Sequence, residues 1–191
     1  GAEGEAFLFF TGKNNFRNHI AKTTPYKSRE SNKPYHYKNV KAYLKSEYRY
    51  QEVNWLEADD LLGIAMAKAE GTFICCSRDK DLRQITGHHF GWEIGNQPQF
   101  GPMFIDKLGW LELSAKRDKC LGGGEKFFHY QMLVGDAVDT IPGVPGIGPV
   151  GAFKILDGCN TLPEMEQAVL GAFKKAYGLF SVDRMRETGR L

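Results

Sequence analysis

The chain has 191 residues, of which 42% are hydrophobic and 13% aromatic, so it is long and apolar enough to form one globular domain with its own core. No run approaches the roughly 18 consecutive apolar residues that span a bilayer, and the first residues lack the basic segment of a signal peptide. We therefore expect a soluble, cytoplasmic protein without membrane contacts, in which a net charge of +2 conceals a strongly basic segment.

The first half of the chain predicts strands that alternate with helices. A buried strand is expected at 5–12, followed by a polar, basic stretch that ends near residue 34. An amphipathic helix then extends to about residue 46, and a second strand is expected at 48–55. A helix with an acidic first turn follows at 56–70.

The rest of the chain continues this pattern with shorter elements. Residues 71–79 predict a short β-rich run and residues 80–85 a helical turn, whereas 87–104 is typical of a hairpin or irregular strands. Helices are expected at 125–135 and, with glycine-bearing turns, from residue 136 onward. Strands that alternate with helices predict an α/β fold with a mainly parallel sheet.

The segment from Lys13 to Tyr50 carries ten Lys or Arg residues against two acids, a net charge of +8. Seven aromatic residues lie among these bases, which is the chemistry of a surface that neutralises phosphates and stacks on bases. An ordinary solvated basic helix explains the pattern equally well, because four bases fall on one helical stripe opposite an apolar face. The bases are Lys38, Lys41, Lys45 and Arg49, and the apolar face is Val40, Leu44 and Tyr48.

The four cysteines show no C-x-x-C spacing, and two of them are adjacent in an apolar run. We expect reduced core thiols in preference to zinc ligands. They are Cys75, Cys76, Cys120 and Cys159.

Acidic residues occur in three groups at the expected ends of strands or starts of helices. Ligands bind outside the carboxyl ends of the strands in a parallel α/β sheet, so acids at these places converge from distant parts of the sequence. For the first group alone, attraction to a helix N-terminus is a sufficient explanation. The groups are Glu57, Asp59 and Asp60; Asp79 and Asp81; and Asp136 and Asp139, which share one face if their turn is helical.

Seven carboxylates in one cleft would repel each other strongly unless cations neutralised them. Oxygen ligands without His or Cys indicate Mg²⁺ or Mn²⁺. There are enough ligands for two ions, and a pair about 3.5 to 4 Å apart is the usual arrangement for in-line attack on a phosphodiester.

The run from Leu133 to Leu156, LVGDAVDTIPGVPGIGPVGAFKIL, predicts a hairpin between two short helices. Gly143, Gly146 and Gly148 allow tight turns, and the prolines at 142, 145 and 149 stand where helices begin. Backbone N–H groups at the start of the second helix can approach a phosphate closely, so such a hairpin can grip a duplex backbone. The alternative is a merely structural turn.

Four motifs together resemble the 5′ nucleases, which include flap endonucleases, the 5′ nuclease domain of DNA polymerase I and phage 5′ to 3′ exonucleases of the T7 type. They are EADD, CSRDKDL, GDAVDTIPGVPGIGPVGAFKIL and the upstream NNFRNHIAKTTPYKSRE, and the likeness spans Phe7 to Leu156. The resemblance implies a PIN-like nuclease core at 1–128. It also implies a helix-three-turn-helix DNA-binding region with a helical tail at 129–191.

The resemblance also implies roles for individual residues. Lys27 and Arg17 would contact the scissile phosphate, with Lys27 stabilising developing charge. Tyr26 would stack on a terminal base, and Arg29 belongs to the same DNA-binding segment. The remaining residues fall into three sets: Glu57, Asp59, Asp60 and Asp79 around one ion; Asp81, Asp136 and Asp139 at the second ion; and Gly143, Gly146 and Gly148 on the duplex, with a K⁺ ion at the hairpin.

The chain departs from the family pattern in three places. The family opens with a strand that ends in a metal-binding aspartate, and this chain has no counterpart of it, so we expect a fragment or a protein with an open sheet edge and one ligand fewer. Gly12 stands where many relatives place an aspartate. The connection from Ser28 to Lys38 is too short for the helical arch that threads a 5′ flap.

From these observations we expect a divalent-metal-dependent 5′ nuclease that acts on DNA 5′ ends, branches or nicks and leaves 5′-phosphate products. The expected setting is replication or repair in a bacterium or a phage-infected cell, with the protein as a monomer. One alternative is a catalytically impaired fragment that binds branched DNA. Another is a ribonuclease of the related toxin type.

Overall fold

The structure, a computed structural model, describes residues 4–28, 32–68 and 73–191, and it has a mixed α/β fold. Strands alternate with helices in the first half of the chain, as the sequence predicts, although the short helix at residues 17–20 was not expected. The elements of this half are β1 (Phe7–Thr11), α1 (Arg17–Ile20), α2 (Tyr37–Glu47), β2 (Arg49–Val53), α3 (Ala58–Lys68), β3 (Ile74–Cys76), the 3₁₀-helix η1 (Asp81–Gln84), β4 (Gly87–Gly91) and β5 (Phe100–Ile105).

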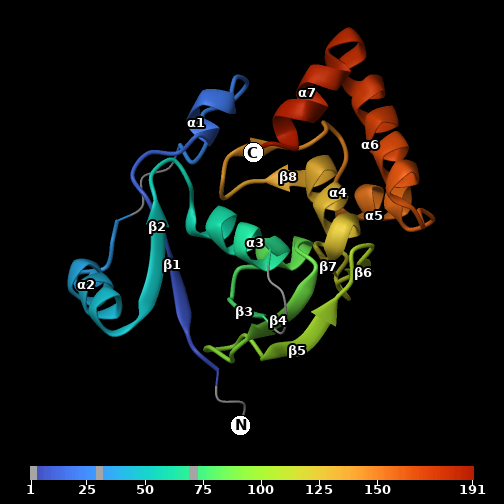
Figure 1. The fold of residues 1–191 in the computed structure, drawn as a ribbon. Helices are drawn as coiled ribbons and strands as arrows, with labels where there is room; N and C mark the ends of the chain where they lie inside the picture. The colour runs from blue at the N-terminus through green and yellow to red at the C-terminus, as the bar shows by residue number, and fades with distance from the viewer. Residues whose placement is uncertain (1–3, 29–31, 69–72) are drawn as a thin grey trace.

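The second half begins with a hairpin and continues mainly as helices. Its elements are β6 (Trp110–Leu113), β7 (Cys120–Gly123), α4 (Gly124–Val134), β8 (Gly135–Asp136), β9 (Ile141–Pro142), α5 (Pro149–Leu156), α6 (Leu162–Tyr177), the 3₁₀-helix η2 (Gly178–Phe180) and α7 (Ser181–Thr188). Figure 1 shows β1, β2 and α2 on one side of the molecule, α3 in the middle and α4 to α7 on the other side.

The described strands form four small sheets, which corrects the expected single, mainly parallel sheet. β1 pairs with β2 and β3 with β4 in parallel, whereas β4–β5, β6–β7 and β8–β9 are antiparallel. The reason lies in the connections: consecutive strands joined without a helical crossover can pair only in antiparallel fashion. The hairpin expected at 87–104 is therefore confirmed, and it accounts for one of the antiparallel pairs.

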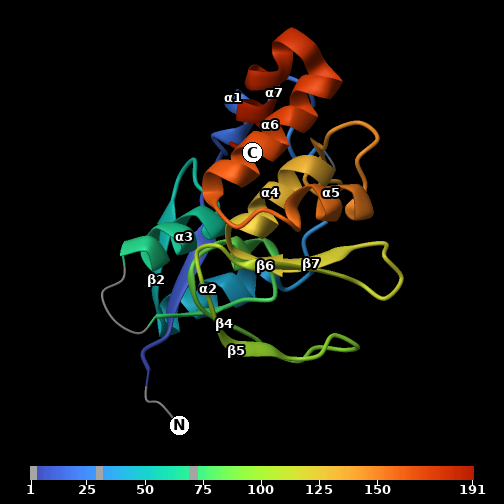
Figure 2. The same ribbon diagram turned by 90° about the vertical axis from the view of Figure 1, so that its right-hand side faces the viewer.

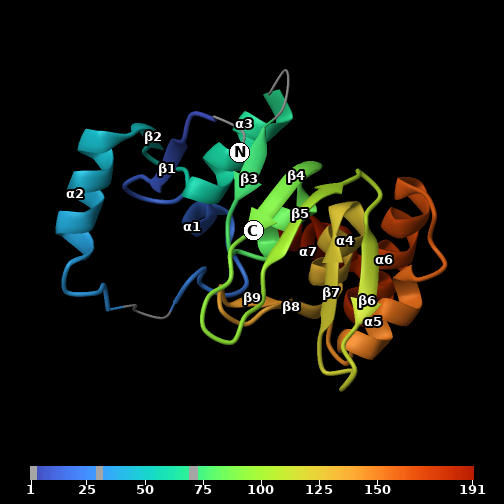
Figure 3. The same cartoon turned by 90° about the horizontal axis from the view of Figure 1, so that it is seen from below.

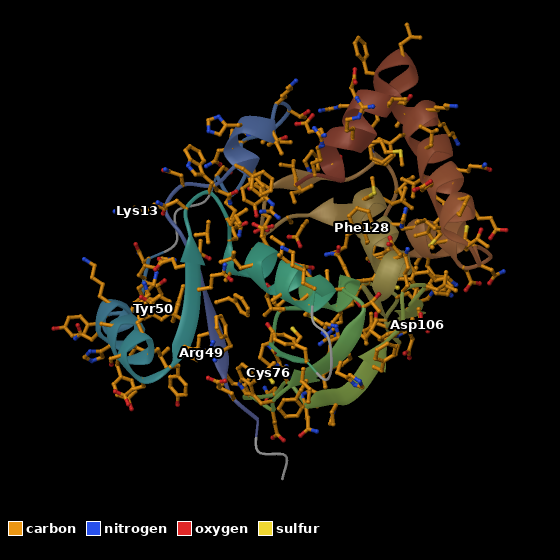
Figure 4. The ribbon with its side chains drawn as sticks, in the orientation of Figure 1. Lys13, Arg49, Tyr50, Cys76, Asp106 and Phe128 are labelled. Atoms are coloured by element: carbon orange, nitrogen blue, oxygen red, sulfur yellow. The ribbon has the colours of Figure 1, made fainter. Side chains whose placement is uncertain are left out.

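Helix α2 contacts the sheet through two of its bases, so Lys41 and Lys45 do not belong to a freely solvated basic face. Lys41 and Lys45 both form ion pairs with Glu52 of β2, and their ammonium groups lie over the ring of Phe10, 5.3 and 5.4 Å from its centroid. Glu52 neutralises the charges of both lysines, and the ring of Phe10 adds a cation–π contact to each. Val40 on the outer side is exposed. Figure 4 shows Arg49 and Tyr50 of β2 beside this helix.

The main hydrophobic core lies under the helices of the second half. Figure 2 shows α4 and α5 between the β6–β7 hairpin and α6. The core continues through α4 without interruption, so the predicted division of the chain between residues 128 and 129 falls inside this helix. The division itself stays a prediction. The core residues are Cys120, Phe127, Tyr130, Met132, Leu133, Val144, Ala152, Leu156, Cys159, Met165, Val169 and Phe173.

The cysteine prediction is confirmed for three residues and wrong for one. All four thiols are free, and Cys75, Cys120 and Cys159 are buried, whereas Cys76 is exposed. Cys76 follows Cys75 in a strand, where successive side chains point to opposite faces, so the two cannot both face the core. None of the helices in the described part of the chain is long and apolar enough to cross a membrane.

A close backbone contact joins the end of β1 to the start of α3. The Gly12 N–H donates to the Leu56 carbonyl at 3.1 Å, and the Ala58 N–H donates to Thr11 Oγ1 at 3.1 Å. A Cβ atom at Gly12 would overlap the carbonyl group of Val53, so this backbone has no room for a side chain at Gly12. The contact fixes the acidic first turn of α3 at the ends of β1 and β2.

Candidate active site

One cleft of about 830 Å³ collects the acidic residues from three distant parts of the chain. They come from the start of α3, from the segment after β3 and from the segment after α4. Phe128 of α4 lines the cleft opposite α3 (Figure 4). The cleft is lined by all seven predicted ligands, Glu57, Asp59, Asp60, Asp79, Asp81, Asp136 and Asp139, and also by Arg17, Tyr26 and Lys27.

Arg17 of α1 closes the first acidic turn with a two-pronged ion pair. Its Nη1 and Nη2 donate to the two carboxylate oxygens of Asp60 at 2.9 and 2.7 Å, and Nη1 also reaches Glu57 Oε2 at 3.3 Å. Asp60 in turn accepts the Glu57 N–H at 2.8 Å, which satisfies a free donor at the start of α3. Burial raises the pKa of Asp60, but the pairing with Arg17 outweighs burial, so the pKa lies below its usual value.

Tyr26 is buried, and its hydroxyl group contacts carboxylates of two of the acidic segments. Its hydroxyl donates to Glu57 Oε2 at 2.7 Å and lies 3.2 Å from Asp139 Oδ2. The side chain is only 7% exposed, which corrects the expectation that its ring stacks on a terminal base. Burial and the hydrogen bond to Glu57 raise the pKa of Tyr26, so it remains a proton donor at neutral pH.

Lys27 connects the same two carboxylates at the surface of the cleft. Its Nζ donates to Glu57 Oε1 at 2.7 Å and lies 3.6 Å from Asp139 Oδ1, and its backbone N–H donates to the Asp139 carbonyl at 3.0 Å. Burial raises the pKa of Glu57, but hydrogen bonds from Lys27 and Tyr26 bring it below the usual value. The Lys27 side chain is 42% exposed, so its ammonium group is accessible from the cleft.

Lys80 forms a third bridge, which the sequence reasoning missed. Its Nζ donates to Asp81 Oδ1 at 2.7 Å and to Asp136 Oδ2 at 3.0 Å. Gln131 of α4 also donates to Asp81. Burial raises the pKa of Asp136, and the pairing with Lys80 lowers it below its usual value. The local sequence places Lys80 between Asp79 and Asp81, but it contains no signal for Asp136, which lies 56 positions away.

Asp59 and Asp79 differ from the other five carboxylates because neither forms an ion pair with a described residue. Burial raises the pKa of Asp59 to about 6, and the negative charges of Asp79 and Glu57 contribute next. This pair is therefore the part of the cleft where the charge of the protein itself is least compensated.

The donor chemistry fits a hard divalent cation, but the side chains are not arranged as a finished metal site. Among residues 4–28, 32–68 and 73–191, no group of three or more Asp, Glu, His or Cys side chains is placed to hold an ion. Three protein cations explain this, since Arg17, Lys27 and Lys80 engage five of the seven carboxylates. Carboxylate oxygens are nevertheless the ligands that Mg²⁺ and Mn²⁺ prefer.

The glycine-rich hairpin joins α4 to α5, and its first part lines the cleft, whereas Gly143, Gly146 and Gly148 do not. Gly143 passes so close to the backbone of Val134 that a Cβ atom would not fit, whereas Gly146 and Gly148 are surrounded by open space. Gly146 needs its glycine for another reason, a φ of +78°. Gly148 is the N-cap of α5, and Pro149 is its first residue, as predicted.

Other expectations for this hairpin need correction. Pro142 lies in β9 and Pro145 in the following turn, so neither begins a helix. The turn that holds Asp136 and Asp139 is not helical, because β8 pairs with β9 there; the two acids meet through the Asp139 N–H, which lies 3.3 Å from Asp136 Oδ1. Arg29 lies outside the described residues.

No protein-family model matches the chain. It is 33% identical over 113 residues to flap endonuclease Xni of Shewanella baltica, which covers 57% of this chain and 39% of that protein. It is also 33% identical over 113 residues to a 5′-3′ exonuclease of Streptomyces coelicolor, covering 59% of this chain and 36% of that protein. The chain thus spans about two fifths of the length of these relatives.

Solved structures show the same fold at low sequence identity. The bacteriophage T5 5′-exonuclease with bound zinc has a TM-score of 0.55 and 14% identity, over 97% of this chain and 82% of that chain. The T5 flap endonuclease in complex with DNA and metal ions also has a TM-score of 0.55 and 14% identity, over 98% and 85% of the two chains.

Proposed function

We propose that the chain belongs to the 5′ nuclease family and that it is a divalent-metal-dependent nuclease, which hydrolyses DNA and leaves 5′-phosphate products. The observation that carries the proposal is the meeting of seven carboxylates with Arg17, Tyr26 and Lys27 in one cleft. Relatives named as flap endonuclease and 5′-3′ exonuclease support this reaction, and a T5 enzyme with bound divalent ions supports the cofactor.

The acids divide into two ligand sets in this proposal. Glu57, Asp59, Asp60 and Asp79 hold one Mg²⁺ or Mn²⁺ ion, and Asp81, Asp136 and Asp139 hold a second or its waters. When bound, the ions supply a water of lowered pKa and polarise the phosphodiester. We place the tighter ion at Asp59 and Asp79, since neither acid forms an ion pair with a described cation.

The cations of the cleft act on the phosphate in this proposal. Lys27 has a 42% exposed side chain and one ammonium group between two carboxylates, so it can turn to a phosphate oxygen and balance the charge that develops during the reaction. Arg17 exposes only 15% of its side chain and already holds Asp60 with two hydrogen bonds. We assign it to the same phosphate, with Asp60 fixing its orientation.

The hairpin before α5 supplies the grip on DNA in this proposal. Gly148, the N-cap of α5, has open space around it, so a duplex phosphate can approach the backbone N–H groups at the start of this helix. Gly143 and Gly146 shape the helix-three-turn-helix and its K⁺ site. The substrates are DNA 5′ ends, nicks or branches in replication or repair, and the protein acts as a monomer in the cytoplasm.

The test is cleavage of a 5′-end-labelled branched duplex with Mg²⁺, beside an EDTA control and the Asp79→Asn, Asp81→Asn double variant. We expect the unmodified protein to cleave the duplex with Mg²⁺, and we expect no cleavage in the EDTA control or by the double variant. The variant should keep or improve DNA affinity by fluorescence anisotropy, because removal of negative charge favours a polyanion. DNA binding without metal-dependent cleavage would overturn the proposal and indicate a binding fragment.

A further inference from the structure

Helix α7 forms hydrogen bonds with the segment that carries Lys27, although the sequence analysis gave this helix no role. We propose that Glu187 of α7 is a positioning residue that holds the segment 21–28, which we call the lysine loop, so that Lys27 faces the cleft. This inference rests on the proposed function, because it concerns the same lysine.

Three hydrogen bonds converge on the Glu187 carboxylate from the first part of the lysine loop. Oε1 accepts the backbone N–H groups of Lys22 and Thr23, each at 2.7 Å, and Oε2 accepts the Thr23 hydroxyl at 2.7 Å. The Glu187 side chain is 13% exposed, and Arg184 lies 3.7 Å away as a counter-charge. Figure 1 shows α7 next to α1, at the edge of the molecule where this contact lies.

A second anchor holds the other end of the lysine loop. The Lys27 N–H donates to the Asp139 carbonyl at 3.0 Å, and Ser28 Oγ lies 3.2 Å from Thr140 Oγ1. The loop is thus held at residues 22–23 by α7 and at residues 27–28 by the turn between β8 and β9.

The conformation of Lys27 explains why two anchors are needed. Its φ is +46°, in the left-handed region that a residue with a side chain rarely adopts. Such a conformation persists only where the surroundings hold it. If Glu187 releases residues 22–23, the loop can relax, and the ammonium group of Lys27 then leaves its place between Glu57 and Asp139.

A carboxylate is the side chain that this place requires. Two backbone N–H groups and one hydroxyl need acceptors, and a carboxylate accepts with both oxygens. Glutamine has one acceptor oxygen, so Glu187→Gln can keep the two N–H bonds on Oε1 and lose the Thr23 hydroxyl as a donor partner. Glu187→Ala loses all three.

The experiment measures kcat and KM for the branched duplex in Glu187→Ala, Glu187→Gln and Lys27→Ala, and in Glu187→Ala combined with Lys27→Ala. Glu166→Ala, which removes an exposed glutamate of α6, is the matched control. We expect Glu187→Ala to lower kcat about tenfold with KM changed less than twofold, and Glu187→Gln to fall between it and the unmodified protein. In the Lys27→Ala background the Glu187 substitution should have no further effect on kcat.

Hydrogen exchange supplies a readout that does not depend on catalysis. We expect the Lys27 amide to exchange at least tenfold faster in Glu187→Ala, with the core amides of α4 unchanged. Equal loss of kcat with and without Lys27, or an unchanged Lys27 amide, would overturn the inference. If Lys27→Ala itself left kcat unchanged, the assignment of Lys27 in the proposed function would fail, while the exchange data would still decide whether Glu187 holds the loop.

Discussion

The helices at the two ends of this molecule are held in place by different forces. At one end, α4, α5 and α6 enclose twelve buried residues, including Leu156 and Phe173. At the other end, α2 contains no buried residue and contacts its sheet through ion pairs of Lys41 and Lys45 with Glu52. Figure 3 shows α2 and α6 on opposite sides, with α3 and the small sheets between them.

This difference between the two ends of the molecule bears on how each wall of the cleft holds its carboxylates. The cleft lies between the two ends, with α4 as one wall and α3 as the other. An apolar core fixes α4. The carboxylates beside this helix are held by Lys80, which bridges Asp81 and Asp136, and by Gln131, which donates to Asp81. On the other wall, Arg17 and Lys27 hold the carboxylates through charge, and these contacts depend on ion pairs that a ligand can displace.

The largest loss of activity should come from substitution in Asp59 and Asp79, the two acids of the cleft that form no ion pair with a described residue. Asp79→Asn is expected to lower kcat by about a thousandfold, because it removes one ligand of the tighter ion. Duplex affinity should stay equal or rise. Asp157→Asn, an exposed aspartate after α5, is the control and should cleave normally. A loss of binding together with cleavage in Asp79→Asn would contradict the metal assignment.

Removal of a leucine from each end compares the two kinds of packing directly. Leu156→Ala opens a space in a fully buried site and should lower the free energy of unfolding by about 3 kcal/mol. Leu44→Ala on α2, where the leucine is only half-buried, should cost about 1 kcal/mol or less. Urea denaturation measures both. Equal losses would mean that α2 depends on apolar packing as much as the helical core does.

The sequence predicts those features whose signals are local. The acidic groups, the helix that carries the first of them and the proline that begins α5 each depend on neighbours within a few positions. The acidic groups and the proline lie where they were expected, and the helix expected from residue 56 begins at Ala58. The same holds for the β4–β5 hairpin.

Features that depend on distant partners could not be read from the sequence. The burial of Tyr26 follows from contacts with Glu57 and Asp139, the latter 113 positions away, and the Glu187 bonds cross 164 and 165 positions. The contact of α2 with the sheet could not be read from its stripes, because Glu52 on the sheet attracts Lys41 and Lys45. Charge complementarity between two elements leaves no periodic signal in either of them.

Substitution of Lys80 tests whether its ammonium group and a divalent ion compete for the same two carboxylates. Its ammonium group occupies the space between Asp81 and Asp136 and should compete with a divalent ion there. Lys80→Met is expected to tighten the weaker Mn²⁺ site about tenfold, which corresponds to about 1.4 kcal/mol. Calorimetric titration of DNA-free protein measures this affinity. Lys174→Met, on the exposed side of α6, should leave it unchanged. Unchanged affinity in Lys80→Met would show that the lysine does not compete.

The smallest expected effect concerns the hairpin, where substitution can separate backbone strain from blocked access. Gly146→Val would confound the two, because Gly146 has a φ of +78°. Gly148 has a φ of −97° with open space around it, so Gly148→Val should fold normally and hinder only the approach of a phosphate to the start of α5. We expect duplex affinity to fall about fivefold at constant melting temperature. Gly158→Val, at an equally open position beyond the far end of α5, is the matched control. If both valine variants bound the duplex equally well, the hairpin would be a structural turn, and the grip on DNA would have to come from the charged end of the molecule.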